Sequence, residues 1–527
     1  LLLAFAVACG PAAAPTPTAT SKPAAPAATP TTAPVVAAPT ATATPVPPAP
    51  KRGGKAIVAT RVEPPHLSIA QQFGEGPDGV DDDRLIARRP SAELYPQLAD
   101  RWEQVDSKTW RFYFKKNVKF WNGETLIPEG IIADAVWQST PANAARLARY
   151  QKDLTGKVID ANTVDIICPT SCPILPSAMT YLRLQAPAWA KANPDKYKLT
   201  TLGLGPYELV EWKKGEFYRT TRFEGYWGEK GLLDEGMVIF RPEAKVRAAM
   251  VGVGEAHIGL DIGVSNRALP PNVLVARLGV ETSGLRQINS RTDPLLKDVR
   301  VRQALSYAID RETITKVLLG GLAKPKHVMF GNPQSVGWTE DPSTKFPYNP
   351  AKARQLIKEA GFEGSEYVIK VPITSSDALQ NELFLSILSY WEAVGLKTKL
   401  IPLESGNQFA TPGIGKDPIY AMNISMTHTN DRFDASGSLF YVDCRAPQSF
   451  TDCDNQPWFE EKYAAADAAG GAERQKRMEE IVIWVLSTAR MIPLWDWPVL
   501  HAVSNDIEWV PSTAIQTGHR WSDIRFK

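Results

Sequence analysis

Two hydrophobic periods divide the chain. From residue 51 to about 285 the pattern is mostly that of strands. In TWRFYFKKNVKF (109–120), Trp110, Phe112 and Phe114 alternate with polar residues or Tyr, which predicts a half-buried strand. KVIDANTVDII and YELVEWKKGEFYRTTRF predict two strand pairs, because turn residues at 160–162 and 213–215 interrupt their apolar runs. We therefore expect this half to be rich in β structure.

The period changes at residue 298. Val301, Ala304, Leu305, Ala308 and Ile309 lie three or four residues apart and so share one helical face. Asp298 can cap the start of this helix and Gly320-Gly321 can end it. The pattern predicts one long amphipathic helix.

A second helix and a parallel strand pair follow. Asn349-Pro350 supplies an N-cap and a first-turn proline, and Gly361 supplies the C-cap. YVIKVPIT (367–374), a helix at 378–394 and LKTKLIPL (396–403) then form a strand–helix–strand unit. Helices covering a parallel sheet are expected here, so the fold class is α/β.

Length and charge limit what the chain can be. Its 527 residues imply two or three cores. The 59 Lys and Arg residues nearly balance the 57 Asp and Glu residues, which argues against a nucleic acid as principal partner. No apolar run approaches the ~18 residues that cross a bilayer.

The N-terminal residues indicate an export signal. LLLAFAVACG resembles the end of a signal peptide, and Ala6-Val7-Ala8-Cys9 resembles a bacterial lipobox, which would make Cys9 a lipidated first residue. The alternative is an ordinary Cys in a hydrophobic leader. Residues 10–51 contain twelve prolines and otherwise mostly Ala and Thr, so they are expected to be a disordered linker reaching roughly 120 Å at most. The expected location is extracytoplasmic, on a membrane through the lipid.

The other four cysteines form two close pairs. Cys168 with Cys172, and Cys444 with Cys453, are each close enough in sequence to form a disulfide, as an oxidising compartment favours. Cys168 and Cys172 could instead be metal ligands, but no further Cys or His lies nearby to complete a tetrahedral site.

Five blocks of sequence resemble one family. PQLADRWEQVDSKTWRFYFKKNVKFWNGETL, GPYELVEWKKGEFYRTTRFEGYWG, INSRTDPLLKDVRVRQALSYAIDRETI, YNPAKARQLIKEAGF and RMIPLW occur in order from residue 96 to 495. They are similar to the oligopeptide- and dipeptide-binding proteins of ABC importers, solute-binding family 5.

This resemblance implies a three-lobed fold of the type II periplasmic binding proteins. One lobe would comprise 52–75, 199–285 and 498–527, an inserted second lobe 76–198, and a third lobe 286–497. It also implies hinge closure on a peptide or small solute, delivery to ABC permease and ATPase subunits, a monomeric protein, and no catalysis or cofactor.

Candidate ligand-binding residues follow from the same resemblance. Asp431, in THTNDRFDASGSL (427–439), lies where family members carry an Asp that binds a peptide's ammonium group. His428 stands near the family's usual Trp, and Arg432 could neutralise Asp431 internally. Asp434 is a weaker substitute for Asp431.

Three further residues are weighed against structural roles. Trp495 and Trp497 could clamp an apolar group or sugar ring, or could be core and rim residues. His66 follows the first strand, where family members present backbone to the ligand, but could be a solvated loop residue.

Enzymatic and metal motifs are not evident. GEGPDG (74–79) fits G-x-G-x-x-G, but Pro77 and the acidic run at 81–83 do not suit a phosphate loop. The six His residues show no metal spacing, so no metal site is expected. A secreted hydrolase with a nonlocal site is the alternative from a different class.

Overall fold

The structure is a computed structural model. It describes residues 51–70, 83–89, 91, 93–143, 147–149, 151–266, 274–277, 282–285, 290–329, 333–372, 378–403, 424–427, 433–439, 441–444, 449, 451–511 and 519–527. The predicted linker at 10–51 and Cys9 lie outside these residues except for Lys51. Among the described helices, none combines the length and apolarity that a bilayer crossing needs.

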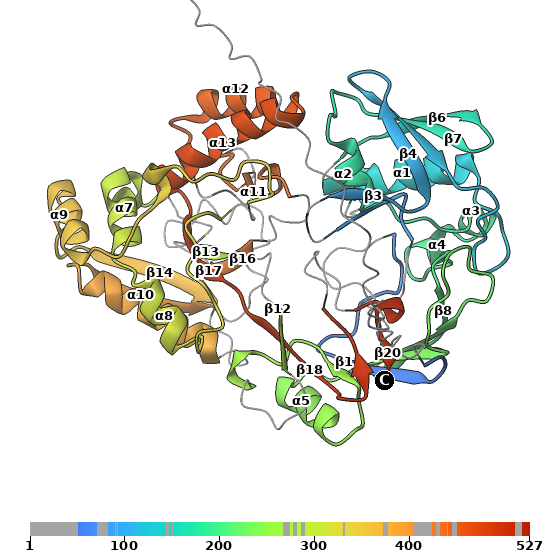
Figure 1. The fold of residues 1–527 in the computed structure, drawn as a ribbon. Coiled ribbons are helices and arrows are strands. Elements are labelled where there is room, and N and C mark those ends of the chain that lie inside the picture. The colour runs from blue at the N-terminus through green and yellow to red at the C-terminus, as the bar shows by residue number, and fades with distance from the viewer. Residues whose placement is uncertain are drawn as a thin grey trace, which may run out of the picture. The chain divides into compact units, whose positions relative to one another are not determined.

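A seven-stranded mixed sheet draws its strands from three distant parts of the chain (Figure 1). β1 occupies its centre and pairs in parallel with β10 and β11. In sheet order the strands are β12 (Leu274–Arg277), β18 (Val499–Val503), β11 (Ile258–Gly259), β1 (Lys55–Thr60), β10 (Glu235–Phe240), β9 (Phe217–Arg222) and β8 (Tyr207–Lys213). Helix α5 (Ala244–Gly252) and the short pair β19 (Ile507–Glu508) and β20 (Arg525–Phe526) accompany this sheet.

A four-stranded antiparallel sheet lies within residues 99–167. Its order is β4 (Ala99–Gln104), β5 (Thr109–Phe114), β7 (Thr163–Ile167) and β6 (Thr155–Asp160). The alternation at 109–114 buries Phe112 and Phe114, as predicted. The other elements here are β2 (Ile86–Arg88), β3 (Leu94–Pro96), α1 (Pro128–Ser139), α2 (Leu175–Met179), α3 (Pro187–Ala192) and α4 (Pro194–Tyr197).

Both predicted strand pairs are confirmed. β6 and β7 pair antiparallel around the turn at 160–162, and β8 and β9 pair around the turn at 213–215. Gly215 has φ +78°, which a residue without a Cβ adopts without strain.

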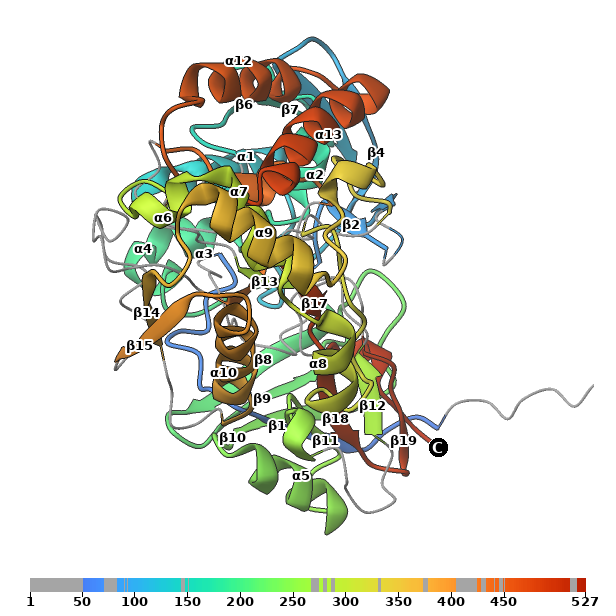
Figure 2. The same ribbon diagram turned by 90° about the vertical axis from the view of Figure 1, so that its left-hand side faces the viewer.

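The segment from 290 to 496 is mainly helical. Its helices are α6 (Pro294–Lys297), α7 (Val299–Tyr307), α8 (Arg311–Val317), α9 (Pro350–Ala360), α10 (Ala378–Glu392), α11 (Ser436–Leu439), α12 (Gln456–Asp467) and α13 (Gly471–Ser487). β14 (Glu366–Pro372) and β15 (Lys397–Leu403) pair in parallel, and α10 between them lies against β15 (Figure 2). The predicted strand–helix–strand unit is confirmed.

The helix predicted from 298 is two helices. Asp298 caps α7 as expected, but the chain leaves the helix after Tyr307, and Asp310 starts α8 by accepting a hydrogen bond from Thr313 N at 3.0 Å. The apolar period continues across the break because Ala308 and Ile309 are themselves buried. The prediction of one long helix was therefore wrong.

The helix from Pro350 has the predicted ends. The Asn349 side chain accepts from Lys352 N, and Gly361 closes the helix with φ +81°. A left-handed C-cap of this kind favours glycine.

Buried side chains gather in separate cores. The seven-stranded sheet carries two, residues between 85 and 204 form another, and the segment after β13 (Thr282–Leu285) forms two more. β13 pairs with β17 (Ile492–Asp496) and not with the seven-stranded sheet, although it precedes residue 286. The lobe boundaries stay a prediction.

Two paired strands run from one sheet into another. β12 pairs with β18 as far as Arg277 and Val499, and β13 resumes the pairing with β17 at Thr282 and Asp496. Only residues 278–281 and 497–498 separate the two antiparallel pairs. We call these two short segments the crossover.

His519 provides a pH test of the C-terminal packing. It is 3% exposed, lies edge-on to Trp521 at 4.4 Å between ring centroids, and neither ring nitrogen has a hydrogen-bond partner among the described residues. Burial, with a smaller effect of His501, lowers its pKa from 6.5 to about 3.

Between pH 6.5 and 3, His519 is therefore protonated in the unfolded chain but stays neutral in the folded chain. This residue should make the free energy of unfolding fall as pH falls through that window, by up to about 1.4 kcal/mol per pH unit. Urea denaturation at pH 7, 5.5 and 4 should show a smaller loss for His519→Leu than for the parent. Parallel pH profiles would disprove this assignment.

Candidate functional site

The predicted ligand segment begins where a strand of a small sheet ends. β16 (Ile424–Thr427) pairs with β13, and β13 pairs with β17, so that Thr427, Thr282 and Asp496 lie in one row across three strands. His428, Asp431 and Arg432 lie outside the described residues. Their flank at Thr427 is placed in the sheet that adjoins the crossover.

Phe433 and Asp434 form the other flank of that segment. Val336 N donates to Phe433 O at 2.8 Å, and Ala435 N donates to Val336 O at 2.9 Å. Phe433 has φ +52° and is 3% exposed. The chain leaving the segment is thus tied by backbone bonds to Val336, which is distant in sequence.

Asp434 is engaged in a buried ion pair. Its carboxylate accepts from Arg474 Nε at 2.7 Å, from Arg474 Nη2 at 3.2 Å and from Ser436 N at 2.9 Å. Burial works to raise the pKa of Asp434, but the charge and hydrogen bonds of Arg474 outweigh it and lower the pKa overall. Its oxygens are occupied by the protein, so we do not include Asp434 among the ligand contacts proposed below.

The two candidate tryptophans differ in environment. Trp495 is fully buried in the core that α7, α9 and α10 share, and its indole Nε1 finds no hydrogen-bond acceptor among the described residues. Trp497 is only partly buried against the same core. Of the two, only Trp497 keeps exposed surface.

Between them, Asp496 forms an ion pair that sequence reasoning missed. Lys326 Nζ lies 3.1 Å from Asp496 Oδ1 and 5.9 Å from the Trp338 ring centroid. Burial raises the pKa of Asp496, and Lys326 partly offsets that effect. The chain around Lys326 pairs with β17, because Lys326 N donates to Leu494 O and Asp496 N donates to Lys324 O. The only feature of the sequence that could have indicated this ion pair is the alternation of Lys324, Pro325 and Lys326.

The loop that contains His66 is tied to the seven-stranded sheet. Glu63 accepts from Trp212 Nε1 at 3.0 Å and from Gly215 N, and Leu67 N donates to Leu199 O at 2.8 Å. His66 is partly buried, and burial lowers its pKa. It lies in the loop that follows the first strand, and its proximity to a ligand stays a prediction.

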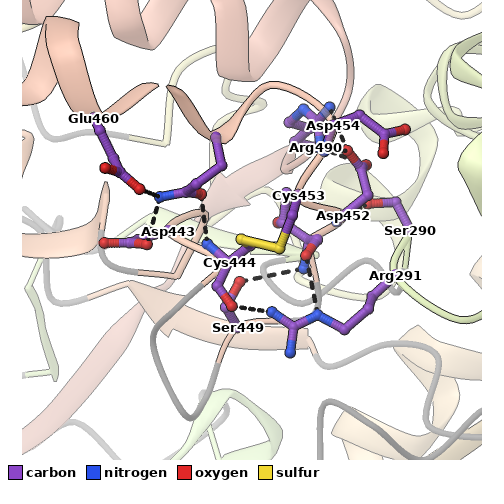
Figure 3. Close-up of a disulfide and its surroundings, with 12 residues drawn as sticks. Ser290, Arg291, Asp443, Cys444, Ser449, Asp452, Cys453, Asp454, Glu460 and Arg490 are labelled. Atoms are coloured by element: carbon purple, nitrogen blue, oxygen red, sulfur yellow. Dashed lines mark hydrogen bonds and ion pairs between the residues drawn. A yellow bond between two sulfur atoms is a disulfide. The ribbon is translucent and has the colours of Figure 1, made fainter. Parts of the chain in front are cut away.

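Both cysteine pairs are disulfides. Cys168 bonds to Cys172, and Cys444 bonds to Cys453. Figure 3 shows the second disulfide beside a polar cluster in which Arg291 donates to Cys444 O and Thr451 O. In the same cluster Arg490 Nη1 donates to Asp452 Oδ2 at 2.7 Å. Because Arg490 lies two residues before the start of β17 at Ile492, this cluster ties the disulfide loop to that strand.

A pocket of about 730 Å³ lies between residues 170–171 and α12. Glu460, Glu461 and Asp467 line it, so its wall on the helical side is acidic. In the described part of the chain, no group of three or more His, Cys, Asp and Glu residues could hold a metal ion. The pocket adjoins the Cys168–Cys172 loop.

Comparison with known proteins identifies relatives. The sequence matches the family model described as bacterial extracellular solute-binding proteins, family 5 (middle), over residues 93–451. It is 26% identical over 359 residues to the dipeptide-binding protein of Escherichia coli K12, covering 60% of this chain and 64% of that protein. It is 28% identical over 356 residues to the glutathione-binding protein GsiB of Salmonella choleraesuis, covering 65% and 66%. The match thus spans just under two thirds of each relative.

Solved structures share the fold. The ABC transporter substrate-binding protein CtaP of Listeria monocytogenes superposes with a TM-score of 0.79 at 19% identity, covering 90% of this chain and 100% of that one. DppA of Helicobacter pylori in complex with the peptide STSA gives 0.71 at 18% identity, covering 90% and 98%. NikA of Brucella suis in complex with Fe(III)-EDTA gives 0.75 at 19% identity, covering 90% and 100%. The predicted fold class, α/β of the type II periplasmic binding proteins, is confirmed.

The buried ion pair leads to a stability prediction. Arg474→Met would leave Asp434 charged and buried without its partner, so the free energy of unfolding should fall by about 3–5 kcal/mol. Arg477→Met is a matched control, because Arg477 lies on the same helix α13 and pairs with the exposed Glu473. It should cost less than about 1 kcal/mol. Equal losses for the two variants in urea denaturation would show that the Asp434 pair does not anchor this flank.

Proposed function

The chain belongs to the bacterial extracellular solute-binding proteins of family 5, and from that membership we propose that it is the substrate-binding component of an ABC importer. In this role it captures a peptide or similar small solute and delivers it to permease and ATPase subunits. In this proposal the protein acts as a monomer and catalyses no reaction. Named relatives and solved neighbours are binding proteins, and no observation favours the hydrolase alternative.

The observation that carries the proposal is the paired crossover. The seven-stranded sheet and the 290–496 segment are joined by two neighbouring chain segments, 278–281 and 497–498, each between paired strands. Rotation in a few residues of such a joint moves two packed bodies without breaking either sheet. A ligand held between the bodies gains contacts only when they close, and so shifts the population toward the closed state.

We propose that the ligand site lies beside the crossover, between the two bodies. Its described members are Trp497, the Asp496–Lys326 pair and the His66 loop, and Asp431 with His428 and Arg432 would complete it. The Asp431 carboxylate would bind a ligand's ammonium group by a charge-assisted hydrogen bond. Strand edges there would pair with an extended ligand's backbone, which gives affinity with little side-chain selectivity.

Named ligands of related proteins set the chemical range. The relatives are named for dipeptides and glutathione, and solved neighbours hold a peptide or Fe(III)-EDTA. All are small polar molecules. We propose a short peptide as the ligand of this chain, because Asp431 lies where family members bind an ammonium group.

Ligand capture is tested by stability and chemical integrity together. A panel of dipeptides added to the purified protein should include members that raise the free energy of unfolding by RT ln(1 + [L]/Kd), which is about 2.7 kcal/mol at a hundredfold excess over Kd. Mass spectrometry should recover the same dipeptide unchanged. Cleavage of the dipeptide would favour the hydrolase.

Asp431→Asn is the matching variant. It keeps the shape of the side chain and removes its charge, so dipeptide affinity measured by calorimetry should fall at least tenfold. Binding of an N-acetylated dipeptide, which lacks the ammonium group, should be equally weak in parent and variant. Unchanged affinity for the free dipeptide would remove Asp431 from the site.

We propose membrane attachment through Cys9. The lipobox-like Ala6-Val7-Ala8-Cys9 and the proline-rich residues 10–51 would act as anchor and spacer on an extracytoplasmic surface. Mass spectrometry of the membrane fraction should find an N-terminal peptide starting at lipidated Cys9, and Cys9→Ser should release the protein from membranes. A Cys9→Ser protein that stays membrane-bound would disprove the anchor.

A further inference from the structure

Two of the packed regions form one body. Tyr226 and Trp227 both donate to Asp83 Oδ2, at 2.8 and 2.7 Å, and Trp121 Nε1 donates to Gly205 O at 3.0 Å. These bonds join the region of the four-stranded sheet to the region of the seven-stranded sheet at several points. The 290–496 segment is instead joined to the seven-stranded sheet through the crossover.

Away from the crossover, the contacts between the region of the four-stranded sheet and the 290–496 segment include two that bear on closure. The Arg88 guanidinium carbon lies 5.3 Å from the centroid of the Phe433 ring. A Cβ built on Gly470 would lie 3.2 Å from Pro173 Cβ. Neither contact is covalent, so both can open if the two bodies separate at the crossover.

The Arg88–Phe433 contact is held rigidly from both sides. Arg88 ends β2 and its Nη2 donates to Ser177 Oγ on α2. Phe433 is nearly fully buried, and its neighbour Asp434 is fixed by the ion pair with Arg474. A guanidinium over an aromatic face at this distance is attracted by the ring's negative face, more strongly when water is excluded.

We propose that Arg88 is a positioning residue for ligand capture: it stacks on Phe433 when the two bodies close and thereby fixes the end of the segment that carries Asp431. This inference rests on the proposed function. Because the contact joins the two bodies, it should add to the population in which they meet, and its loss should act mainly on the rate of ligand release.

The chain offers a matched control next to Arg88. The Arg89 guanidinium lies 4.8 Å from the Tyr95 ring centroid and 3.3 Å from Glu93, and both partners belong to the same region as Arg89. Arg89→Met removes the same charge and the same kind of contact without touching the 290–496 segment. A change specific to Arg88→Met therefore reports the contact between the bodies.

A ligand-free cross-link measures closure directly. In Pro173→Cys/Gly470→Cys the two sulfurs can bond when the bodies meet, since the Cβ separation is near the disulfide range. Gly470 has φ −122°, which any residue adopts. Copper phenanthroline and oxygen oxidise the two thiols, and mass spectrometry of the peptides separates the new bond from the native Cys168–Cys172 disulfide.

Arg88→Met and Phe433→Leu should each slow this cross-link about fivefold, the factor expected for a partly exposed cation–π contact. The double variant should be no slower than either single one, and Arg89→Met should match the parent. Equal rates in the parent and Arg88→Met, or additive losses in the double variant, would overturn the proposal.

The dipeptide panel then separates this inference from the proposed function. For a dipeptide that binds the parent, Arg88→Met should raise the dissociation rate about fivefold with little change in the association rate, and an unchanged dissociation rate would overturn the positioning role. If no dipeptide binds any variant, the proposed ligand class fails, and the cross-linking rates still decide whether Arg88 holds the bodies together.

Discussion

The arrangement depends on a pair of antiparallel strands that leaves one sheet and enters another. The chain segment that forms β12 and then β13 is paired with the segment that forms β17 and then β18, so the same two segments pair on both sides of the crossover. Two hydrogen-bonded strands resist shear between themselves but can bend together where the pairing is interrupted. The pairing of β13 with both β16 and β17 brings the end of β16 next to the crossover, where we propose that the two bodies bend.

Buried charges hold the polar chain around this joint in position. Asp434 with Arg474 and Asp452 with Arg490 are ion pairs with little exposure. The buried Arg311 guanidinium is instead held by hydrogen bonds that it donates to the carbonyls of Pro493, Ser306 and Phe346. Burial lowers the pKa of Arg311 to about 10, so the guanidinium stays charged at neutral pH. Buried charges of this kind cost stability unless every partner is in place, and so they tolerate few alternative arrangements of the loops they join.

The Asp434–Arg474 pair also leads to the contact between the two bodies. Arg474 holds Asp434, Asp434 follows Phe433, and Phe433 meets Arg88. In the proposed function, the segment after β16 starts next to the crossover at Thr427 and ends at the Arg88–Phe433 contact. A ligand bound by that segment would be sensitive to both, which relates affinity to closure without requiring Arg88 to touch the ligand.

The sequence determined the elements whose signals are local. Turns at 160–162 and 213–215, the caps at Asn349 and Gly361, and the strand–helix–strand unit at 366–403 follow from short-range sterics and hydrogen bonding, which neighbouring residues supply. The family blocks added the fold class, and they predict where the ligand segment lies. At 308–310 the local signal was ambiguous. Ala308 and Ile309 continue the apolar period of a helix because they are buried, and this hid the break between α7 and α8.

Only the tertiary structure decided which charges meet. Asp434 finds Arg474 and Asp496 finds Lys326 across 40 and 170 positions of sequence, and Trp495 proves to be core while Trp497 keeps some exposure. A carboxylate's role depends on whether its partner is a protein cation or a ligand. That partner is chosen by the packing of distant elements, which no local pattern of residues specifies.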